Sequence, residues 1–322
     1  MVVKVSAIVP VYNSENFLEK CLDTLVNQTL LEKELVIVND GSKDASEQII
    51  QSYMDKYPGM IQYISIPNGG VANARNIALD HACGEYITFC DSDDYFDLDM
   101  FEELYNKATS TGADIVVSGY YYEEENGKYS IKGLGNVEAF SHSLQENPEM
   151  IFHTNAYSCT KLFSKKMIDE HQLRFKKYRI FEDLLFFYSA MLVANKVEKV
   201  DKPFYHYIRR ENTSVTGKMN EKFYDLYPVM QDLKDLYQGK IDQEYLTYIA
   251  IRHAYLRFKM NVSKDTLGLK HEYIVNTYAF LDVYDPNWKK NVYFKRRKRD
   301  GFIYKTVWYW MLQPYVKKLL KR

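Results

Sequence analysis

The first 120 residues alternate between short apolar segments and longer segments with helical periodicity. The apolar segments are rich in β-branched and aromatic residues, as expected of strands buried on both faces of a sheet. They read VSAIVPVY, ELVIVND, MIQYISI, GEYITFCD and ADIVVSGYYY in chain order. Helical patterns lie between them, at residues 15–28, 44–57, 70–82 and 97–111. This alternation predicts a doubly wound α/β sheet.

The middle of the chain, residues 122–216, is less regular. SCTKLFSKKMI predicts a strand that enters a helix, and IFEDLLFFYSAMLV predicts a largely buried helix. PFYHYIRR predicts another strand. This region therefore extends the α/β part of the chain.

Helical periodicity dominates from residue 220 onward. We place a domain boundary near Gly217, with an α/β domain over residues 1–217 and a mainly α-helical domain over residues 218–322. Within the second domain, caps or breaks are expected near Pro228, Gly239, Gly268 and Pro286.

The chain has 322 residues, of which 46% are hydrophobic, so it can form a sizeable core. The four cysteines form no Cys-x-x-Cys pair, which indicates buried thiols in a reducing compartment. The apolar start lacks a long h-region and a small-residue cleavage site, and no run reaches the ~18 apolar residues of a spanning helix. These features predict a cytoplasmic protein.

Polar residues gather where the predicted strands end. In doubly wound sheets, ligands bind outside the carboxyl ends of the strands. We therefore expect a ligand site along this edge. The polar residues there are Tyr12 and Asn13, then 39–42, 68–70 and 91–94.

Asp91, Asp93 and Asp94 follow the fourth strand, where their charges repel one another. A solvated turn is the simplest interpretation. A calcium loop of the EF-hand type is rejected, because Tyr95 and Phe96 occupy positions that need a ligand and a glycine. A phosphatase with an Asp nucleophile stays an alternative, although its Asp-x-Asp usually follows the first strand. The third interpretation is Mg²⁺ or Mn²⁺ held between carboxylates and a nucleotide diphosphate.

Four motifs in order decide among these interpretations: IVPVYN, VNDGSKD, NGGVANARN and CDSDD. Together they resemble the family-two glycosyltransferases over about residues 6–216. The resemblance implies an inverting enzyme with the Rossmann-like nucleotide-sugar-binding fold called GT-A, a mixed sheet. No G-x-G-x-x-G follows the first strand and no Walker sequence is present, which favours diphosphate binding through a metal.

The resemblance also implies how the nucleotide of a UDP-sugar is bound. Pro10 and Tyr12 would lie against the base, and Asp40 would accept a hydrogen bond from uracil. Asn68 and Arg75 would close over the nucleotide and its phosphates. A capping role is the alternative for Asp40, and an exposed helical charge is the alternative for Arg75.

In the acidic motif, Asp93 is expected to bind the metal, and Asp91 to contact the metal and the ribose or base side. Asp94 would shape the loop or meet the donor sugar. His206 is a further candidate metal ligand, with a packed strand histidine as the alternative. The remaining expected nucleotide contacts are Ser92, Arg209, Arg210 and Ser214, and the sequence does not decide which arginine meets the diphosphate.

Transfer to an acceptor hydroxyl also requires a base. Acids at a helix start often serve as caps, and that is the alternative for the pair in FEDLLF. By resemblance, Asp183 is the catalytic base and Glu182 a supporting contact. Lys161 in TKLF either reaches the donor or acceptor or is a surface lysine, and the surface position is the expectation.

The end of the chain differs in charge from the rest. Of the 42 Lys and Arg residues, 12 lie in residues 289–322 beside one acid, which leaves 30 basic and 42 acidic residues in 1–288. Aromatic residues interleave with these cations, so the tail predicts either peripheral contact with anionic lipid at the inner face of the membrane or a terminal helix with a solvated face. No nucleic-acid-binding module accompanies it, so a nucleic-acid partner is not expected.

The sequence thus predicts a metal-dependent transferase that moves one hexose or N-acetylhexosamine from a UDP-sugar. The expected acceptor is a glycan, whether lipid-linked, polymeric or borne by a protein. Processive members carry Gln-x-x-Arg-Trp and spanning helices, and this chain has neither. The alternatives are the phosphatase and a GT-A-derived assembly module without activity.

Overall fold

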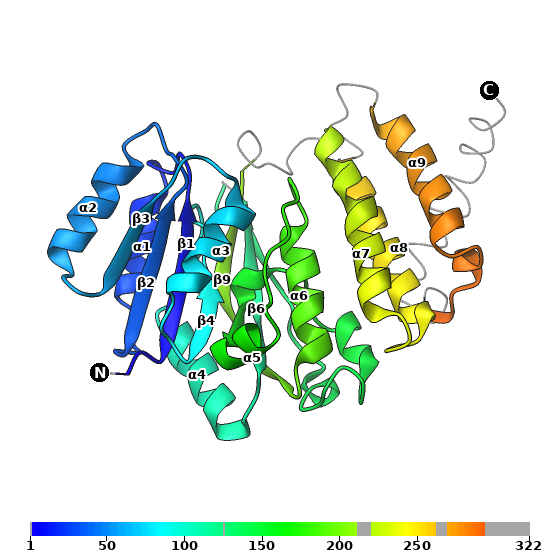
Figure 1. Cartoon of the computed structure of the whole chain (residues 1–322), viewed down its shortest axis with the longest axis horizontal. Helices are drawn as coiled ribbons and strands as arrows, with labels where there is room; N and C mark the ends of the chain where they lie inside the picture. Colours follow the sequence, from blue (N-terminus) through cyan, green and yellow to red (C-terminus); the bar gives the residue numbers. More distant parts are fainter. Residues whose placement is uncertain (1, 125, 211–219, 262–268, 294–322) are drawn as a thin grey trace. The chain divides into compact units, whose positions relative to one another are not determined.

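The computed structural model describes residues 2–124, 126–210, 220–261 and 269–293. The chain divides into two compact units, Met1–Arg210 and Glu211–Arg322 (Figure 1). The boundary expected near Gly217 lies outside the described residues. Each unit is described by itself below.

The first unit is built on a mixed sheet, which has nine strands within the described residues. The strands are β1 (Val5–Val11), β2 (Lys33–Asn39), β3 (Ile61–Ser65), β4 (Tyr86–Phe89), β5 (Tyr95–Phe96), β6 (Ile115–Glu124), β7 (Tyr129–Lys132), β8 (Lys161–Ser164) and β9 (Val197–Arg209). Their order is β3-β2-β1-β4-β8-β6-β9-β5, and β7 pairs with β6. The helices are α1 (Leu18–Val26), α2 (Ser46–Lys56), α3 (Val71–His81), α4 (Met100–Thr111), α5 (Lys165–Glu170) and α6 (Glu182–Val193).

The direction of the strands brings several carboxyl ends to one edge of the sheet. Strands β1 to β4 are parallel, and the chain order reverses between β1 and β4. Strand β8 is antiparallel to both β4 and β6, so β6 and its parallel neighbour β9 run in the same direction as β4. The carboxyl ends of β1, β4, β6 and β9 therefore all lie at the edge where such sheets bind ligands.

Helices cover both faces of this sheet. Right-handed crossovers place α1 and α2 on one face and α3 on the other, because the chain moves in opposite directions along the sheet. Figure 1 shows α3, α5 and α6 in front of the strands and α1 behind them. The first turns of α3 and α6 thus reach the ligand edge from the same face.

A cluster of phenylalanines anchors α6 to the sheet. Phe89 of β4 lies 5.0 to 5.9 Å, between ring centroids, from Phe163, Phe175 and Phe186. Phe175 and Phe186 stack in parallel at 4.1 Å. Edge-to-face pairs of this kind add to the free energy gained from burying the rings. The cluster therefore holds α6, with its two acidic residues, against the strand that carries the aspartate motif.

The predicted elements of the first 120 residues are present, with ends shifted by a few residues. The predicted helix at 15–28 begins at Leu18, and the predicted strand at 203–210 begins earlier, at Val197. Two strands were not predicted, β5 and β7. Strand β5 has only two residues, and it exists because Tyr95 and Phe96 pair with His206 and Tyr205 of β9.

The second unit contains three helices in its described part: α7 (Leu226–Tyr237), α8 (Gln243–Asn261) and α9 (Leu269–Tyr284). Pro228 does not break α7, because it lies in the first turn, where the missing N–H costs no helical bond. Gly239 follows α7 with φ +72°, and Pro286 follows α9, as predicted. Gly268 lies outside the described residues.

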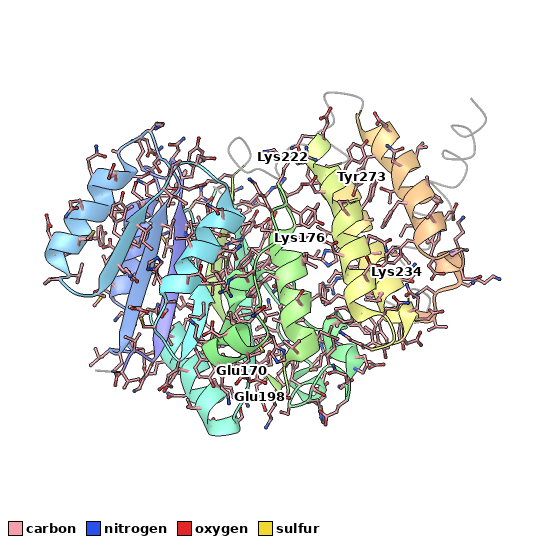
Figure 2. The ribbon with its side chains drawn as sticks, viewed as in Figure 1. Glu170, Lys176, Glu198, Lys222, Lys234 and Tyr273 are labelled. Atoms are coloured by element: carbon pink, nitrogen blue, oxygen red, sulfur yellow. The ribbon has the colours of Figure 1, made fainter. Side chains whose placement is uncertain are left out.

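Tyrosines form much of the interface between α7 and α9. Tyr227 stacks on Tyr273 at 6.2 Å between centroids and donates to, or accepts from, the Thr277 hydroxyl at 2.8 Å. Lys234 donates to the Tyr284 carbonyl at the end of α9. Figure 2 shows the side chains of these helices, with Lys234 and Tyr273 labelled. Across the described residues, no helix combines the length and apolarity needed to cross a membrane.

Replacing Phe89 by alanine should lower the free energy of unfolding by about 3–5 kcal/mol, because a ring with no exposure is lost from a packed cluster. Urea denaturation followed by circular dichroism measures this. Leu31→Ala is the control, since Leu31 is 79% exposed and its loss should change stability by about 0.5 kcal/mol or less. Similar losses for both variants would contradict the assignment of Phe89 to a packed cluster that stabilises the fold.

Candidate active site

The loop after β4 and the first turns of α3 and α6 meet at Arg75. The guanidinium of Arg75 donates to Asp91 Oδ1 at 2.8 Å and to Glu182 Oε1 at 2.7 Å. It is 4% exposed and lies 5.1 Å from the centroid of the Phe175 ring. Burial lowers the pKa of Arg75, but Asp91 and Glu182 outweigh burial, so its pKa is raised and it stays charged. The exposed helical charge that was the alternative for Arg75 is therefore excluded.

The carboxylates of the Asp91–Asp94 loop face different partners. Asp93 Oδ2 accepts from Arg210 Nη1 at 2.8 Å, and its side chain is 48% exposed. Asp94 is buried and accepts from the Tyr205 hydroxyl and, at 2.9 Å, from the Ile208 N–H. Asp94 thus ties the loop to β9, which is the loop-shaping role, whereas Asp93 and, at 37% side-chain exposure, Asp91 reach solvent.

Burial, and after it the repulsion between neighbouring carboxylates, raises the pKa values of Asp93 and Asp94. Desolvation by the surrounding protein and then the charge of Asp91 raise the pKa of Asp93, while Arg210 opposes them. Burial, followed by the charges of Asp93 and Asp91, raises the pKa of Asp94 well above its usual range. A cation placed at the exposed carboxylate would relieve this repulsion.

Arg210 and Arg209, the last residues of the segment at β9, differ in their surroundings. Arg210 is 7% exposed, and its guanidinium donates to both the carboxylate and the main-chain carbonyl of Asp93. It also lies 4.0 Å from the centroid of the Phe17 ring. Arg209 is half-buried. Arg210 is thus directed at the acidic loop.

Asp40 organises the turn after β3. Its carboxylate accepts from the N–H groups of Gly69 at 2.7 Å and Gly70 at 2.9 Å, and its carbonyl accepts from Asn68 Nδ2 at 3.1 Å. A side chain at Gly41 would meet the Asn68 nitrogen at 2.9 Å, so only glycine allows the two turns to approach. Asp40 and Asn68 are thus brought together, with two carboxylate positions of Asp40 already occupied.

The remaining expected nucleotide contacts lie around the end of β1. Pro10 is buried within the strand, opposite Val38, whereas Tyr12 just beyond it is 52% exposed. The Ser92 hydroxyl lies 2.7 Å from the Ser14 hydroxyl in a buried contact. Tyr12 thus offers an open ring at the ligand edge, while Ser92 has a structural partner.

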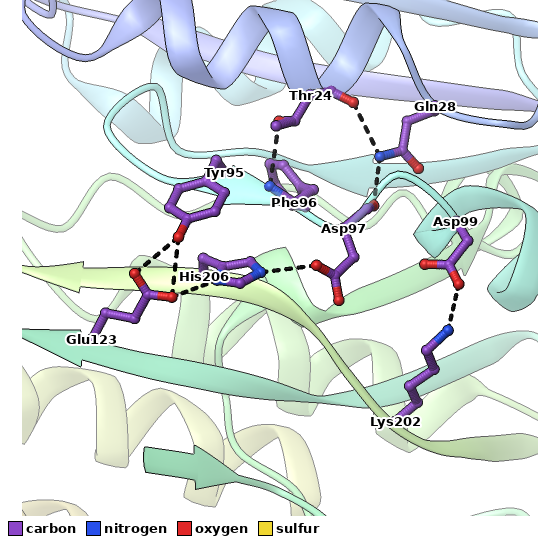
Figure 3. A network of polar contacts seen from close by, with 9 residues as sticks. All are labelled: Thr24, Gln28, Tyr95, Phe96, Asp97, Asp99, Glu123, Lys202 and His206. Carbon is purple, nitrogen blue, oxygen red and sulfur yellow. Dashed lines mark hydrogen bonds and ion pairs between the residues drawn. The ribbon is translucent and has the colours of Figure 1, made fainter. Parts of the chain in front are cut away.

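His206 does not join Asp93. Its Nδ1 lies 2.5 Å from Glu123 Oε1 and its Nε2 lies 3.0 Å from Asp97 Oδ1 (Figure 3). The ring is stacked between Tyr95 at 4.2 Å and Tyr121 at 4.3 Å. Both ring nitrogens are engaged by carboxylates, which is the arrangement of a packed strand histidine. The metal-ligand role of His206 stays a prediction.

Glu182 and Asp183 open α6. Phe181, just before them, has φ +70°, a conformation uncommon for residues other than glycine that turns the chain into the helix. Asp183 is half-buried and its Oδ1 accepts from the Leu184 N–H at 2.8 Å. Its charge acts on two buried cations, Arg75 and Lys161. Asp183 is therefore placed close to Arg75 and Lys161.

The structure differs from the expectation for Lys161 and does not describe Ser214 or most of the basic tail. Lys161 is not on the surface: its side chain is completely buried, because β8 begins there and α6 covers it. Ser214 and most of the basic tail, residues 294–322, lie outside the described residues. No role is assigned to them from the structure.

The donor set fits a hard cation shared with a diphosphate. Within the described ranges, no group of three or more His, Cys, Asp or Glu side chains could hold a metal by itself. Mg²⁺ and Mn²⁺ suit sites with one or two carboxylates in which phosphates and water complete the shell. Asp93, with Asp91 beside it, provides such a partial shell.

Sequence reasoning missed three residues that hold the acidic loop: Tyr205, Glu123 and Asp97. Tyr205 bonds to Asp94, and the other two bond to His206. Their partners lie between 83 and 111 residues away in the chain. The alternation of PFYHYIRR was the available signal, since it places Tyr205 and His206 on opposite faces of one strand.

The chain is similar to one known family and to several glycosyltransferases. A family model described as Glycosyl transferase family 2 matches residues 6–172. Glycosyltransferase GlyA of Streptococcus pneumoniae is 37% identical over 220 residues, which is 65% of this chain and 31% of GlyA. The uncharacterized glycosyltransferase EpsJ of Bacillus subtilis is 34% identical over 75% of this chain and 70% of EpsJ. The chain thus spans about a third of the length of GlyA and most of EpsJ.

A solved structure is similar across both units. The crystal structure of Staphylococcus aureus TarS 1–349 in complex with UDP-GlcNAc matches with a TM-score of 0.72 and 23% identity. The match covers 90% of this chain and 84% of that one. It shows that the two proteins share a fold, which is GT-A with a helical C-terminal region. TarS is named a poly(ribitol-phosphate) beta-N-acetylglucosaminyltransferase.

Arg75→Met should lower the free energy of unfolding by about 3–5 kcal/mol, because it leaves the buried carboxylate of Glu182 without its cation. The other partner, Asp91, has a side chain that is 37% exposed, so water can solvate it. Arg174→Met is the matched control. Arg174 also pairs with an aspartate, Asp80, at 2.7 Å, but the two side chains are 38% and 59% exposed, so about 1 kcal/mol or less should be lost. Chemical denaturation at pH 7 measures both, and equal losses would contradict a buried hub at Arg75.

Proposed function

Because the chain belongs to glycosyl transferase family 2 and is a glycosyltransferase, we propose that it transfers a single hexose or N-acetylhexosamine from a UDP-sugar to a glycan hydroxyl, with inversion. The observation that carries the proposal is the Arg75 ion-pair network. It joins the acidic loop after β4 to the first turn of α6, where Asp183 lies. A nucleotide-sugar seated between these two elements would have its diphosphate near Asp93 and its anomeric carbon near Asp183.

Asp183 acts as the base in this proposal. Its carboxylate removes the proton of the acceptor hydroxyl while the acceptor oxygen bonds to the anomeric carbon. The bond from that carbon to the diphosphate oxygen breaks on the opposite face, and UDP leaves with the negative charge. Glu182 is held by Arg75 and supports the helix start, so it contributes to positioning.

Binding of the nucleotide falls to the other side of the network. Tyr12 offers a ring for the base, and Asp40 and Asn68 form the adjoining turn. Asp93, with Asp91, would hold Mn²⁺ or Mg²⁺, which supplies positive charge for the departing diphosphate. Asp93 would hold such an ion in place of the guanidinium of Arg210, and Arg210 would then be able to meet a phosphate.

The donor and the acceptor are inferred from relatives. TarS was solved with UDP-GlcNAc and is named for transfer to poly(ribitol phosphate), and a Bacillus spizizenii relative is named a poly(ribitol-phosphate) beta-glucosyltransferase. A cell-surface polymer of the teichoic type is therefore the acceptor class that we propose. UDP-linked glucose and N-acetylglucosamine are the first donors to test.

Release of UDP from a panel of UDP-sugars, with a teichoic-type polymer as acceptor, tests the proposal. We expect release with one donor in the presence of Mn²⁺ or Mg²⁺, and a loss of at least about tenfold with a chelator, because the diphosphate then lacks its counter-ion. Release that persists fully with chelator would overturn the metal role. Metal-independent release of phosphate from simple esters would instead support an Asp-nucleophile phosphatase.

Asp183→Asn should reduce turnover by a factor of about 10²–10⁴ while UDP binding, measured by calorimetry, is retained, because only proton removal is lost. Asp169→Asn is the control: Asp169 is an exposed acid on α5 paired with Lys165, away from the Arg75 network. Unchanged turnover in Asp183→Asn would refute its assignment as base.

A further inference from the structure

Lys161 is a completely buried cation that the proposed mechanism does not use. Its Nζ donates to Asn155 Oδ1 at 3.0 Å, to the Tyr157 carbonyl at 2.5 Å and to Thr160 Oγ1 at 3.1 Å. Three acceptors match the three N–H donors of an ammonium group. A neutral amine would have only two donors and would turn a lone pair toward one of these oxygens. The geometry is therefore that of a charged lysine enclosed by protein.

The ammonium group lies against the helix that carries the proposed base. Its Nζ is 4.4 Å from the centroid of the Phe187 ring on α6. Phe187 and Asp183 are four residues apart, so they share one face of that helix. The charge of Asp183 acts on Lys161, as does the neighbouring Cys159. The lysine thus faces the same side of α6 as the base carboxylate.

A charge inside a protein is costly unless another group compensates it. Burial lowers the pKa of Lys161 to about 7, and Cys159 and Asp183 act in the opposite direction. The hydrogen bonds to Lys161 are accepted by neutral groups. Burial raises the pKa of the Cys159 thiol well above its usual range, so that group is neutral. Among the described residues that act on Lys161, Asp183 therefore carries the opposite formal charge. A methionine of similar shape would avoid the cost, so the retained charge calls for a reason in the chemistry of the site.

We propose that Lys161 is a positioning residue for the transfer reaction. Its buried ammonium stabilises the ionised form of Asp183, and its hydrogen bonds hold residues 155–160 in place. This inference rests on the proposed function. Lys161 cannot touch donor or acceptor, because its side chain has no exposed surface and its three N–H groups are used. It acts through the base, by charge.

A double-mutant cycle tests the charge coupling without any substrate. Lys161→Gln retains hydrogen-bond donors but removes the charge, and Asp183→Asn removes the opposite charge. Lys161→Gln should change the unfolding equilibrium constant by some factor in the native chain and by a smaller factor in the Asp183→Asn variant. We expect the first factor to be at least about three times the second. Lys166→Met, an exposed lysine with 81% side-chain exposure, should show no such coupling to Asp183→Asn. Additive effects for Lys161 would overturn the inference, whatever the activity of the protein.

Turnover supplies the second readout, as UDP release from the best donor of the panel. Lys161→Gln should lower kcat about tenfold or more, leave KM for the UDP-sugar within about twofold, and move the acid limb of the pH profile to higher pH, because the base loses a stabilising charge. In the native protein, the ammonium charge of Lys161 is present below a pH of about 7 and is lost above it. Turnover of the native protein should therefore fall above this pH, and turnover of Lys161→Gln should show no such alkaline limb.

The outcomes separate the two proposals. If the native protein releases UDP from none of the donors, the proposed function fails while the cycle still reports on the charge pair. If the native protein is active and Lys161→Gln has an unchanged pH profile, only the inference fails. Should Lys161→Gln not fold, the alkaline limb of the native profile decides, and its absence would count against the inference.

Discussion

The site depends on one buried guanidinium. Arg75 joins Asp91, at the end of a central strand, to Glu182, at the start of a helix that is distant in sequence. Glu182 alone would be expensive to bury, and the shared cation makes its proximity to the partly exposed Asp91 favourable. Because Arg75 belongs to α3, the helix that follows the loop organised by Asp40, a single side chain links that loop, the acidic loop and the start of α6. A displacement of any of the three elements would leave a buried charge without a partner.

Strand β9 applies the same principle to the other side of the acidic loop. Tyr205 and the Ile208 N–H satisfy Asp94, Arg210 satisfies Asp93, and His206 lies between Glu123 and Asp97. Asp94 is saturated by buried partners, whereas Asp93 has an exposed carboxylate whose partner is a side chain at the end of a strand. The first is suited to holding the loop in shape. The second is suited to exchanging its partner for a ligand, so the loop separates a structural role from a binding role within two adjacent residues.

Much of this could be predicted from the sequence, because the strands β1 to β4 and the polar residues after them are encoded locally. The parallel direction of those strands then gathers Asp40, Asn68 and Asp91 at one edge. Partners distant in sequence could not be predicted in this way. Strand β5 has two residues and owes its existence to β9, and the burial of Lys161 depends on α6. The contacts of His206 could not be predicted because its partners Glu123 and Asp97 carry no motif of their own.

The burial of basic residues near the acids bears on how such a site can stay both ordered and reactive. Water would screen the charges of Asp183 and its neighbours if the cations were exposed, and each ion pair would then be worth little. Arg75, Arg210 and Lys161 are all less than a tenth exposed, so their fields act through protein. In the proposed reaction, charges fixed in this way would not have to reorganise when the acceptor loses its proton and the diphosphate departs. The cost of burying three cations is thus met in the folded chain, before substrate arrives, and a polar surface loop with the same residues would lack that advantage.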